Sequence, residues 1–224
     1  MPSPPTVRSR RFLALGDSYT IGESVVSSER WPEQLTARLR AEGLAMADPV
    51  VIAQTGWTTD ELMGGMEEKG MWAPAAGRRG GGGLRHEVFD LVTLLIGVNN
   101  QYCGRSVEEY REKFRVLLDR AIHLAGNRPG HAVVVSIPDW GVMPFAEGRD
   151  RAQIAAEIDA FNEVNREEAT RVGARYVDVT SISREATQRP QLGATDGLHP
   201  SGEQYTRWTE RIEPVAREIV RSSR

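Results

Sequence analysis

The sequence predicts an α/β domain built on a parallel β-sheet with helices on both faces. Short apolar runs alternate with longer amphipathic segments along the whole chain, which is typical of this class. The run at 90–96, DLVTLLI, is apolar almost throughout, as strands buried on both faces are. No linker or change of composition divides the 224 residues. We therefore expect one domain at 11–224, preceded by a flexible N-terminal tail at 1–10.

Five short apolar runs are the expected strands of this sheet. They are 11–15, 50–53, 90–96, 132–137 and 175–179. Gly16 follows the first run and Pro138 the fourth, and both residue types interrupt regular structure. The sequence therefore predicts a parallel sheet of about five strands.

Apolar residues recurring at three- and four-residue steps predict the helices. They are expected at 31–42, 107–124, 154–172 and 205–219. Pro32 suits the first turn of the first helix. Ser106 is the expected N-cap of the second, with Glu108 and Glu109 where the helix dipole favours them. Pro214 should kink or shorten the last helix.

The segment 64–86 differs from the rest of the chain because it contains GG and then GRRGGGG. It is too rich in glycine and too aperiodic to be core, so a long loop between the second and third strands is expected. Its glycines match neither GxGxxG nor the P-loop pattern, which argues against phosphate binding.

Composition and charge narrow the class of protein. Hydrophobic residues make up 40% and charged residues 26%, enough apolar material to exclude general disorder. The net charge of −3 gives no electrostatic footprint for nucleic acid or an anionic membrane. The single Cys103 excludes an internal disulfide and a Cys-based zinc cluster. Because the basic N-terminus precedes no apolar stretch of signal-peptide length, and no apolar run could span a bilayer, a cytoplasmic location without stable membrane insertion is expected.

Four polar, glycine-bearing loops follow the expected strands or precede the last helix. They are 16–20 (GDSYT), 54–59 (QTGWTT), 97–100 (GVNN) and 196–200 (DGLHP). Each alone is compatible with a helix cap or a turn. In open parallel sheets, however, ligands bind at the carboxyl ends of the strands, so these loops should converge.

Taken together, the four loops contain the groups that acyl transfer requires. A serine hydroxyl needs a base to become a nucleophile. Ser18 is the candidate nucleophile and His199 the candidate base, and Asp196, three residues before His199, could orient the imidazole. The tetrahedral intermediate needs donors for its oxyanion. The backbone N–H groups of Ser18 and Gly56 and the side-chain amide of Asn99 could supply them. Glycine suits this role because substrate can approach a main chain that has no Cβ.

These blocks, in this order, resemble the SGNH subgroup of the GDSL hydrolases, a family of serine esterases and lipases that includes lysophospholipase-like enzymes. The resemblance implies that Ser18 is the nucleophile, His199 the base and Asp196 the third member of the triad. It implies that Gly56 and Asn99 complete the oxyanion hole. It also implies a flavodoxin-like three-layer α/β/α fold (the SGNH hydrolase fold), with no metal and no organic cofactor.

Five large apolar residues in or beyond the strand-end loops are candidates for a substrate pocket. They are Trp57, Tyr102, Trp140, Met143 and Phe145. They could equally cover the edge of the sheet. Asp17 is expected to brace the site through hydrogen bonds to nearby backbone rather than to act as an acid.

The favoured function is hydrolysis of small-molecule carboxylic esters through an acyl-enzyme. Short acyl esters, acetylated sugars and lysophospholipids all fit the motifs. A flavodoxin-like ligand-binding module and a catalytically silent member of the family are the alternatives. The sequence leaves the oligomeric state open.

Overall fold

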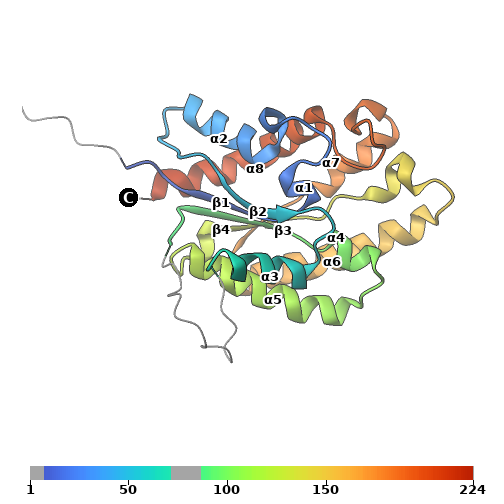
Figure 1. Cartoon of the computed structure of the whole chain (residues 1–224), viewed down its shortest axis with the longest axis horizontal. Coiled ribbons are helices and arrows are strands. Elements are labelled where there is room, and N and C mark those ends of the chain that lie inside the picture. Colours follow the sequence, from blue (N-terminus) through green and yellow to red (C-terminus); the bar gives the residue numbers. More distant parts are fainter. Residues whose placement is uncertain (1–7, 72–86, 224) are drawn as a thin grey trace, which may run out of the picture.

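Five parallel strands form the sheet in the part of the chain that the computed structural model describes, residues 8–71 and 87–223 (Figure 1). The strands are β1 (Phe12–Asp17), β2 (Val50–Gln54), β3 (Leu91–Leu95), β4 (Ala132–Val135) and β5 (Arg175–Val177). They lie in the order β2-β1-β3-β4-β5. This is the flavodoxin-like order, in which the winding direction reverses between β1 and β3 and the carboxyl ends open a crevice. The predicted fold class is confirmed.

Helices cover both faces of the sheet. They are α1 (Ser18–Ile21), α2 (Trp31–Ala41), α3 (Thr59–Glu68), α4 (Val98–Tyr102), α5 (Val107–Leu124), α6 (Arg151–Val172), α7 (Thr180–Arg184) and α8 (Gly202–Ser222). Figure 1 shows α2 and α8 over one face and α3, α5 and α6 over the other. The 3₁₀ turns are η1 (Ser27–Glu29), η2 (Pro129–His131), η3 (Trp140–Val142), η4 (Pro144–Ala146), η5 (Glu185–Thr187) and η6 (Pro190–Leu192).

Strands β1, β4 and β5 end at other residues than predicted: β1 continues further, whereas β4 and β5 end earlier. Gly16 lies inside β1 rather than after it, because it pairs with Ala53 of β2 and Leu95 of β3. The position requires glycine, since a Cβ there would meet the Thr20 side chain at 2.1 Å. At the end of β4, the Ile137 N–H is bonded to the Asn162 side chain at 2.7 Å. Near β5, the Val179 N–H is bonded to the Ser136 hydroxyl at 2.8 Å. Side-chain hydrogen bonds thus replace the backbone hydrogen bonds of the sheet just beyond β4 and β5.

The helix predictions hold well for α5 and less well for α8. The Ser106 hydroxyl accepts the Glu109 N–H at 3.1 Å, and α5 then runs over the predicted 107–124. Shortening of the last helix was wrong, since α8 continues through Pro214. Trp208 before the proline and Ile219 after it are both buried, and this packing offsets the roughly 3 kcal/mol that a proline costs inside a helix.

The expected loop at 64–86 needs correction where the structure describes it. Residues 64–68 belong to α3, which begins with a capping box formed by Thr58 and Glu61. The cap and burial of Leu62 and Met66 outweigh the low helix propensity of the two glycines. Residues 72–86 lie outside the described residues.

The predicted N-terminal tail also needs correction in part. Arg8 forms an ion pair with Asp90 at 3.0 Å, and Arg10 forms an isolated bridge with Met46. Residues 8–10 are therefore attached to the sheet, whereas 1–7 lie outside the described residues. None of the described helices has the length and apolarity that crossing a membrane requires.

Candidate active site

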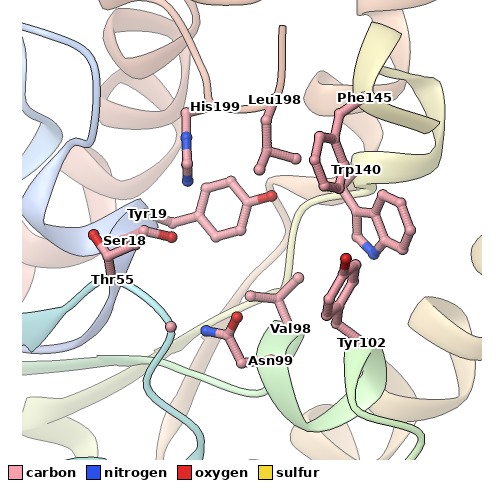
Figure 2. A pocket seen from close by; sticks show the side chains of 11 residues that line it. Ser18, Tyr19, Thr55, Val98, Asn99, Tyr102, Trp140, Phe145, Leu198 and His199 are labelled. Atoms are coloured by element: carbon pink, nitrogen blue, oxygen red, sulfur yellow. The ribbon is translucent and has the colours of Figure 1, made fainter. Parts of the chain in front are cut away.

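A cavity of about 190 Å³ lies at the carboxyl ends of the central strands (Figure 2). Its lining comes from five distant parts of the chain: Ser18, Tyr19, Thr55, Gly56, Val98, Asn99, Tyr102, Trp140, Phe145, Leu198 and His199. The predicted convergence of the loops is thus present. Of the predicted triad and oxyanion residues, all but Asp196 line the cavity, and Asp196 lies behind His199, bonded to its ring.

Ser18 is the first residue of α1, directly after β1. Asp17 caps this short helix, because its Oδ1 accepts the Tyr19 N–H at 3.0 Å. Ser18 is only 5% exposed, and its hydroxyl has no hydrogen-bond partner among the described residues. Figure 2 shows the His199 imidazole directed toward Ser18 across the cavity. A hydroxyl and a base that share a cavity can come into contact when substrate binds, since such bonds are often long in unliganded enzymes.

Asp196 holds the His199 ring from the side away from the cavity. Its Oδ2 lies 2.6 Å from His199 Nδ1 and 2.6 Å from the Ser24 hydroxyl. Its Oδ1 accepts the backbone N–H groups of Leu198 and His199 at 2.9 and 3.0 Å. Partial burial opposes ionisation, but these hydrogen bonds outweigh it and hold the pKa of Asp196 well below its usual range. Asp196 is therefore a carboxylate that fixes the ring, and Nε2 has no hydrogen-bond partner in the part of the chain that the structure describes.

Gly56 and Asn99 also line the cavity, and Figure 2 shows Asn99 on the opposite side of it from His199. Gly56 has a φ of +83°, a conformation that favours glycine, and no atom lies within 4 Å of the place of a Cβ. Its N–H has no acceptor among the described residues. The Asn99 amide is fixed by a bond from Nδ2 to the Trp57 carbonyl at 2.8 Å, which leaves its second hydrogen available.

Three of the five predicted pocket residues form an aromatic wall, consisting of Tyr102, Trp140 and Phe145, with ring centroids 5.5 to 6.3 Å apart. The Arg149 guanidinium lies over all three rings at 5.1 to 5.5 Å and donates to the Tyr102 hydroxyl at 3.1 Å. Trp140 Nε1 donates to Gln101 Oε1 at 2.8 Å. Stacking and hydrogen bonds thus fix the wall in place.

The other two predicted pocket residues lie elsewhere. The Trp57 ring packs against Gly65 of α3, where an added Cβ would meet it at 2.2 Å. Met143 is buried in a small separate cluster with Ala186 and Leu192. Both side chains pack inward rather than line the cavity.

Sequence reasoning missed several residues of the site. Tyr19, Val98 and Leu198 line the cavity and stand directly beside Ser18, Asn99 and His199 in the chain. Adjacency within the motifs was the signal that could have found them. No local signal pointed to Ser24, because its partner Asp196 lies 172 residues away.

Asp17 directly precedes Ser18 in the chain and is fully buried, and it does not line the cavity. Burial raises the pKa of its carboxyl to about 7, although the backbone hydrogen bonds that it accepts work in the opposite direction. Its bond to the Tyr19 N–H fits the predicted bracing role.

Comparisons with known proteins show the family to which this chain belongs. A sequence model of the GDSL-like lipase/acylhydrolase family matches residues 14–207. The chain therefore belongs to this family, and it is an ester-hydrolysing serine hydrolase. No curated protein matches the sequence at a significant level.

Solved structures share the fold at low sequence identity. TesA superposes with a TM-score of 0.68 at 18% identity, over 94% of this chain and 99% of that one. A lipase/acylhydrolase from Enterococcus faecalis gives 0.65 at 20% identity, over 94% and 95%. Axe2, an acetylxylan esterase from Geobacillus stearothermophilus, gives 0.65 at 17% identity, over 94% of both chains.

Proposed function

We propose that Ser18, His199 and Asp196 form the catalytic triad of this hydrolase. We further propose that the N–H groups of Ser18 and Gly56 and the Asn99 amide form its oxyanion hole. The observation that carries the proposal is the 2.6 Å contact between Asp196 and His199 Nδ1, on a ring that faces the same cavity as Ser18. An imidazole bonded to a carboxylate through Nδ1 presents Nε2 as a base.

The proposed reaction has two parts. The Ser18 oxygen attacks the ester carbonyl while His199 Nε2 takes its proton, and the carbonyl electron pair moves to the oxygen held by the N–H donors. The bond to the alkoxy group then breaks, and the proton passes from His199 to the departing alcohol. Water repeats the sequence on the acyl-enzyme and releases the carboxylic acid and free Ser18.

The cavity supports small substrates. Its volume of about 190 Å³ is below the roughly 300–1,000 Å³ of pockets that hold drug-sized ligands. We therefore propose that the group bound beside Ser18 is a short acyl or small alcohol group. Short acyl esters and acetylated sugars fit this limit better than the long chain of a lysophospholipid does.

The test is turnover of p-nitrophenyl acetate by wild type and by Ser18→Ala. We expect the variant to lose hydrolysis, because it lacks the hydroxyl proposed to attack the ester carbonyl. Wild type should also be labelled by a serine-reactive phosphonate, and Ser18→Ala should not. Ser28→Ala, an exposed serine in η1, is the matched control and should keep both properties.

Retained turnover in Ser18→Ala would remove Ser18 from this role. An unlabelled and inactive wild type would instead favour a binding module or a silent member of the family.

A further inference from the structure

Tyr19 lines the cavity, and contacts on its ring and backbone hold it in place. Its side chain is only 3% exposed. The ring contacts His199 edge-on at 5.6 Å between centroids and Trp208 at 6.2 Å. Its backbone N–H is fixed by Asp17 at 3.0 Å. The position of the hydroxyl is therefore set by packing.

The Tyr19 hydroxyl is an unpartnered polar group in a largely apolar space. Figure 2 shows it between Ser18 and the aromatic wall, near Val98 and Leu198. No hydrogen bond to it is formed by the residues at 8–71 and 87–223. The polar atoms of the wall are already engaged, since the Tyr102 hydroxyl bonds Arg149 and Trp140 Nε1 bonds Gln101.

This hydroxyl stays neutral and can donate. Burial, above all, and the nearby carboxylates of Asp17, Asp139 and Asp196 hold the pKa of Tyr19 well above its usual range. A neutral phenol supplies one donor and one acceptor. Its chemistry thus matches a substrate hydroxyl, which is both donor and acceptor as well.

The energetic consequence depends on what fills the cavity. An alkyl group would displace water from the Tyr19 hydroxyl and leave it without a partner, which is costly for a buried polar group. A substrate group with a hydroxyl at that point would instead form the hydrogen bond to Tyr19 that the displaced water had made. Sites built to bond a substrate hydroxyl discriminate strongly against the analogue that lacks it.

We propose that Tyr19 is a specificity-determining residue, and that its hydroxyl selects esters with a hydroxyl group on the arm that enters the cavity. This inference rests on the proposed function and names the substrate class of the same site. The arm is either the acyl chain or the alcohol, and both present the same chemistry to Tyr19.

The experiment compares esters that differ by one hydroxyl. For the acyl arm, kcat/KM is measured with p-nitrophenyl butyrate and p-nitrophenyl 3-hydroxybutyrate. For the alcohol arm, it is measured with propyl acetate and 3-hydroxypropyl acetate. Wild type, Tyr19→Phe and the matched control Tyr102→Phe are each tested on both pairs. Intrinsic reactivity of the esters cancels when the ratio within a pair is compared between enzymes.

In one of the two pairs, we expect the ratio of kcat/KM for the hydroxylated ester to kcat/KM for the plain ester to be higher in wild type than in Tyr19→Phe, by roughly tenfold or more. The pair that responds identifies the arm. Tyr102→Phe should keep the wild-type ratio, because the hydroxyl that it lacks bonds Arg149. Tyr19→Phe keeps the ring, and its melting temperature checks that it folds as wild type does.

Equal ratios in wild type and Tyr19→Phe for both pairs, with active enzymes, would overturn the inference alone. A wild type that hydrolyses none of the four esters would overturn both the inference and the proposed function.

Discussion

Single residues of the site are held by partners that are distant in the sequence. Ser24 bonds Asp196, and the Trp57 carbonyl bonds the Asn99 amide at 2.8 Å. These contacts orient the groups before substrate arrives, and preorganised donors stabilise charge at little reorganisation cost. The motifs predicted which residues meet, but they gave no information on these supporting bonds.

Asn99 is the side chain of the proposed oxyanion hole that mutation can remove. Asn99→Ala should lower kcat on p-nitrophenyl acetate by about 10²–10³, or roughly 2.7–4 kcal/mol, the scale of one oxyanion donor. Asn99→Asp keeps the shape without the donor and should lose activity similarly. A melting temperature close to that of wild type would show that folding is intact. An unchanged kcat in both variants would exclude the assignment.

At the scale of elements, the sequence predicted the existence of the main strands and helices better than their ends. The apolar stripe and the Ser106 cap predicted the bounds of α5, because both signals are local. The glycines at 64 and 65 suggested a loop, yet they belong to α3. Gly65 is there because the Trp57 ring fills the place of its side chain, a contact between two elements that glycine content alone does not reveal.

Adjacent glycines in α3 give a matched test of that packing. Gly64→Ala should raise the free energy of unfolding by about 0.5–1 kcal/mol, since alanine favours helix and nothing lies within 4 Å of its Cβ. Gly65→Ala should lower it by about 1 kcal/mol or more, because the clash with Trp57 exceeds the gain in propensity. Urea unfolding of both variants measures this. A stabilising Gly65→Ala would mean that Trp57 repacks freely.

At the scale of the whole molecule, burial and charge set how stability varies with pH. Glu168 is buried among the guanidinium groups of Arg111, Arg115 and Arg171. Burial disfavours its charge, but these ion pairs outweigh it and lower the pKa of Glu168 to about 2. Its contribution to the free energy of unfolding is therefore complete above its ordinary pKa and is lost only in acid. Asp17 has a raised pKa instead, so its effect on stability changes with pH in the opposite direction.

The burial of Asp17 predicts a loss of stability toward neutral pH. Its pKa of about 7 lies above the ordinary 3.8, so the native state retains a proton that the unfolded chain has lost. Stability from this group falls as pH rises between those values. Asp17→Asn keeps an acceptor for the Tyr19 N–H and lacks the charge. The free energy of unfolding of Asp17→Asn, relative to that of wild type, should increase from pH 5 to pH 8, by a few kcal/mol at most.

Urea unfolding of wild type and Asp17→Asn at pH 5, 6, 7 and 8 measures this gain. The range stays above the acid window of Glu168, so that group does not contribute a slope. A difference between the two proteins that is the same at all four pH values would contradict a raised pKa for Asp17.

The sequence by itself determined the class of fold, the main elements and the four loops of the site. It could do so because hydrophobic periodicity and short motifs are local, and parallel strands bring their carboxyl ends to one edge. Only the tertiary structure decided which side chains face the cavity. The Trp57 and Met143 side chains pack against neighbouring elements, whereas Tyr19, Val98 and Leu198 line the cavity. Side-chain direction at a loop depends on which neighbouring elements fill the adjacent space, and that information is spread over the whole chain.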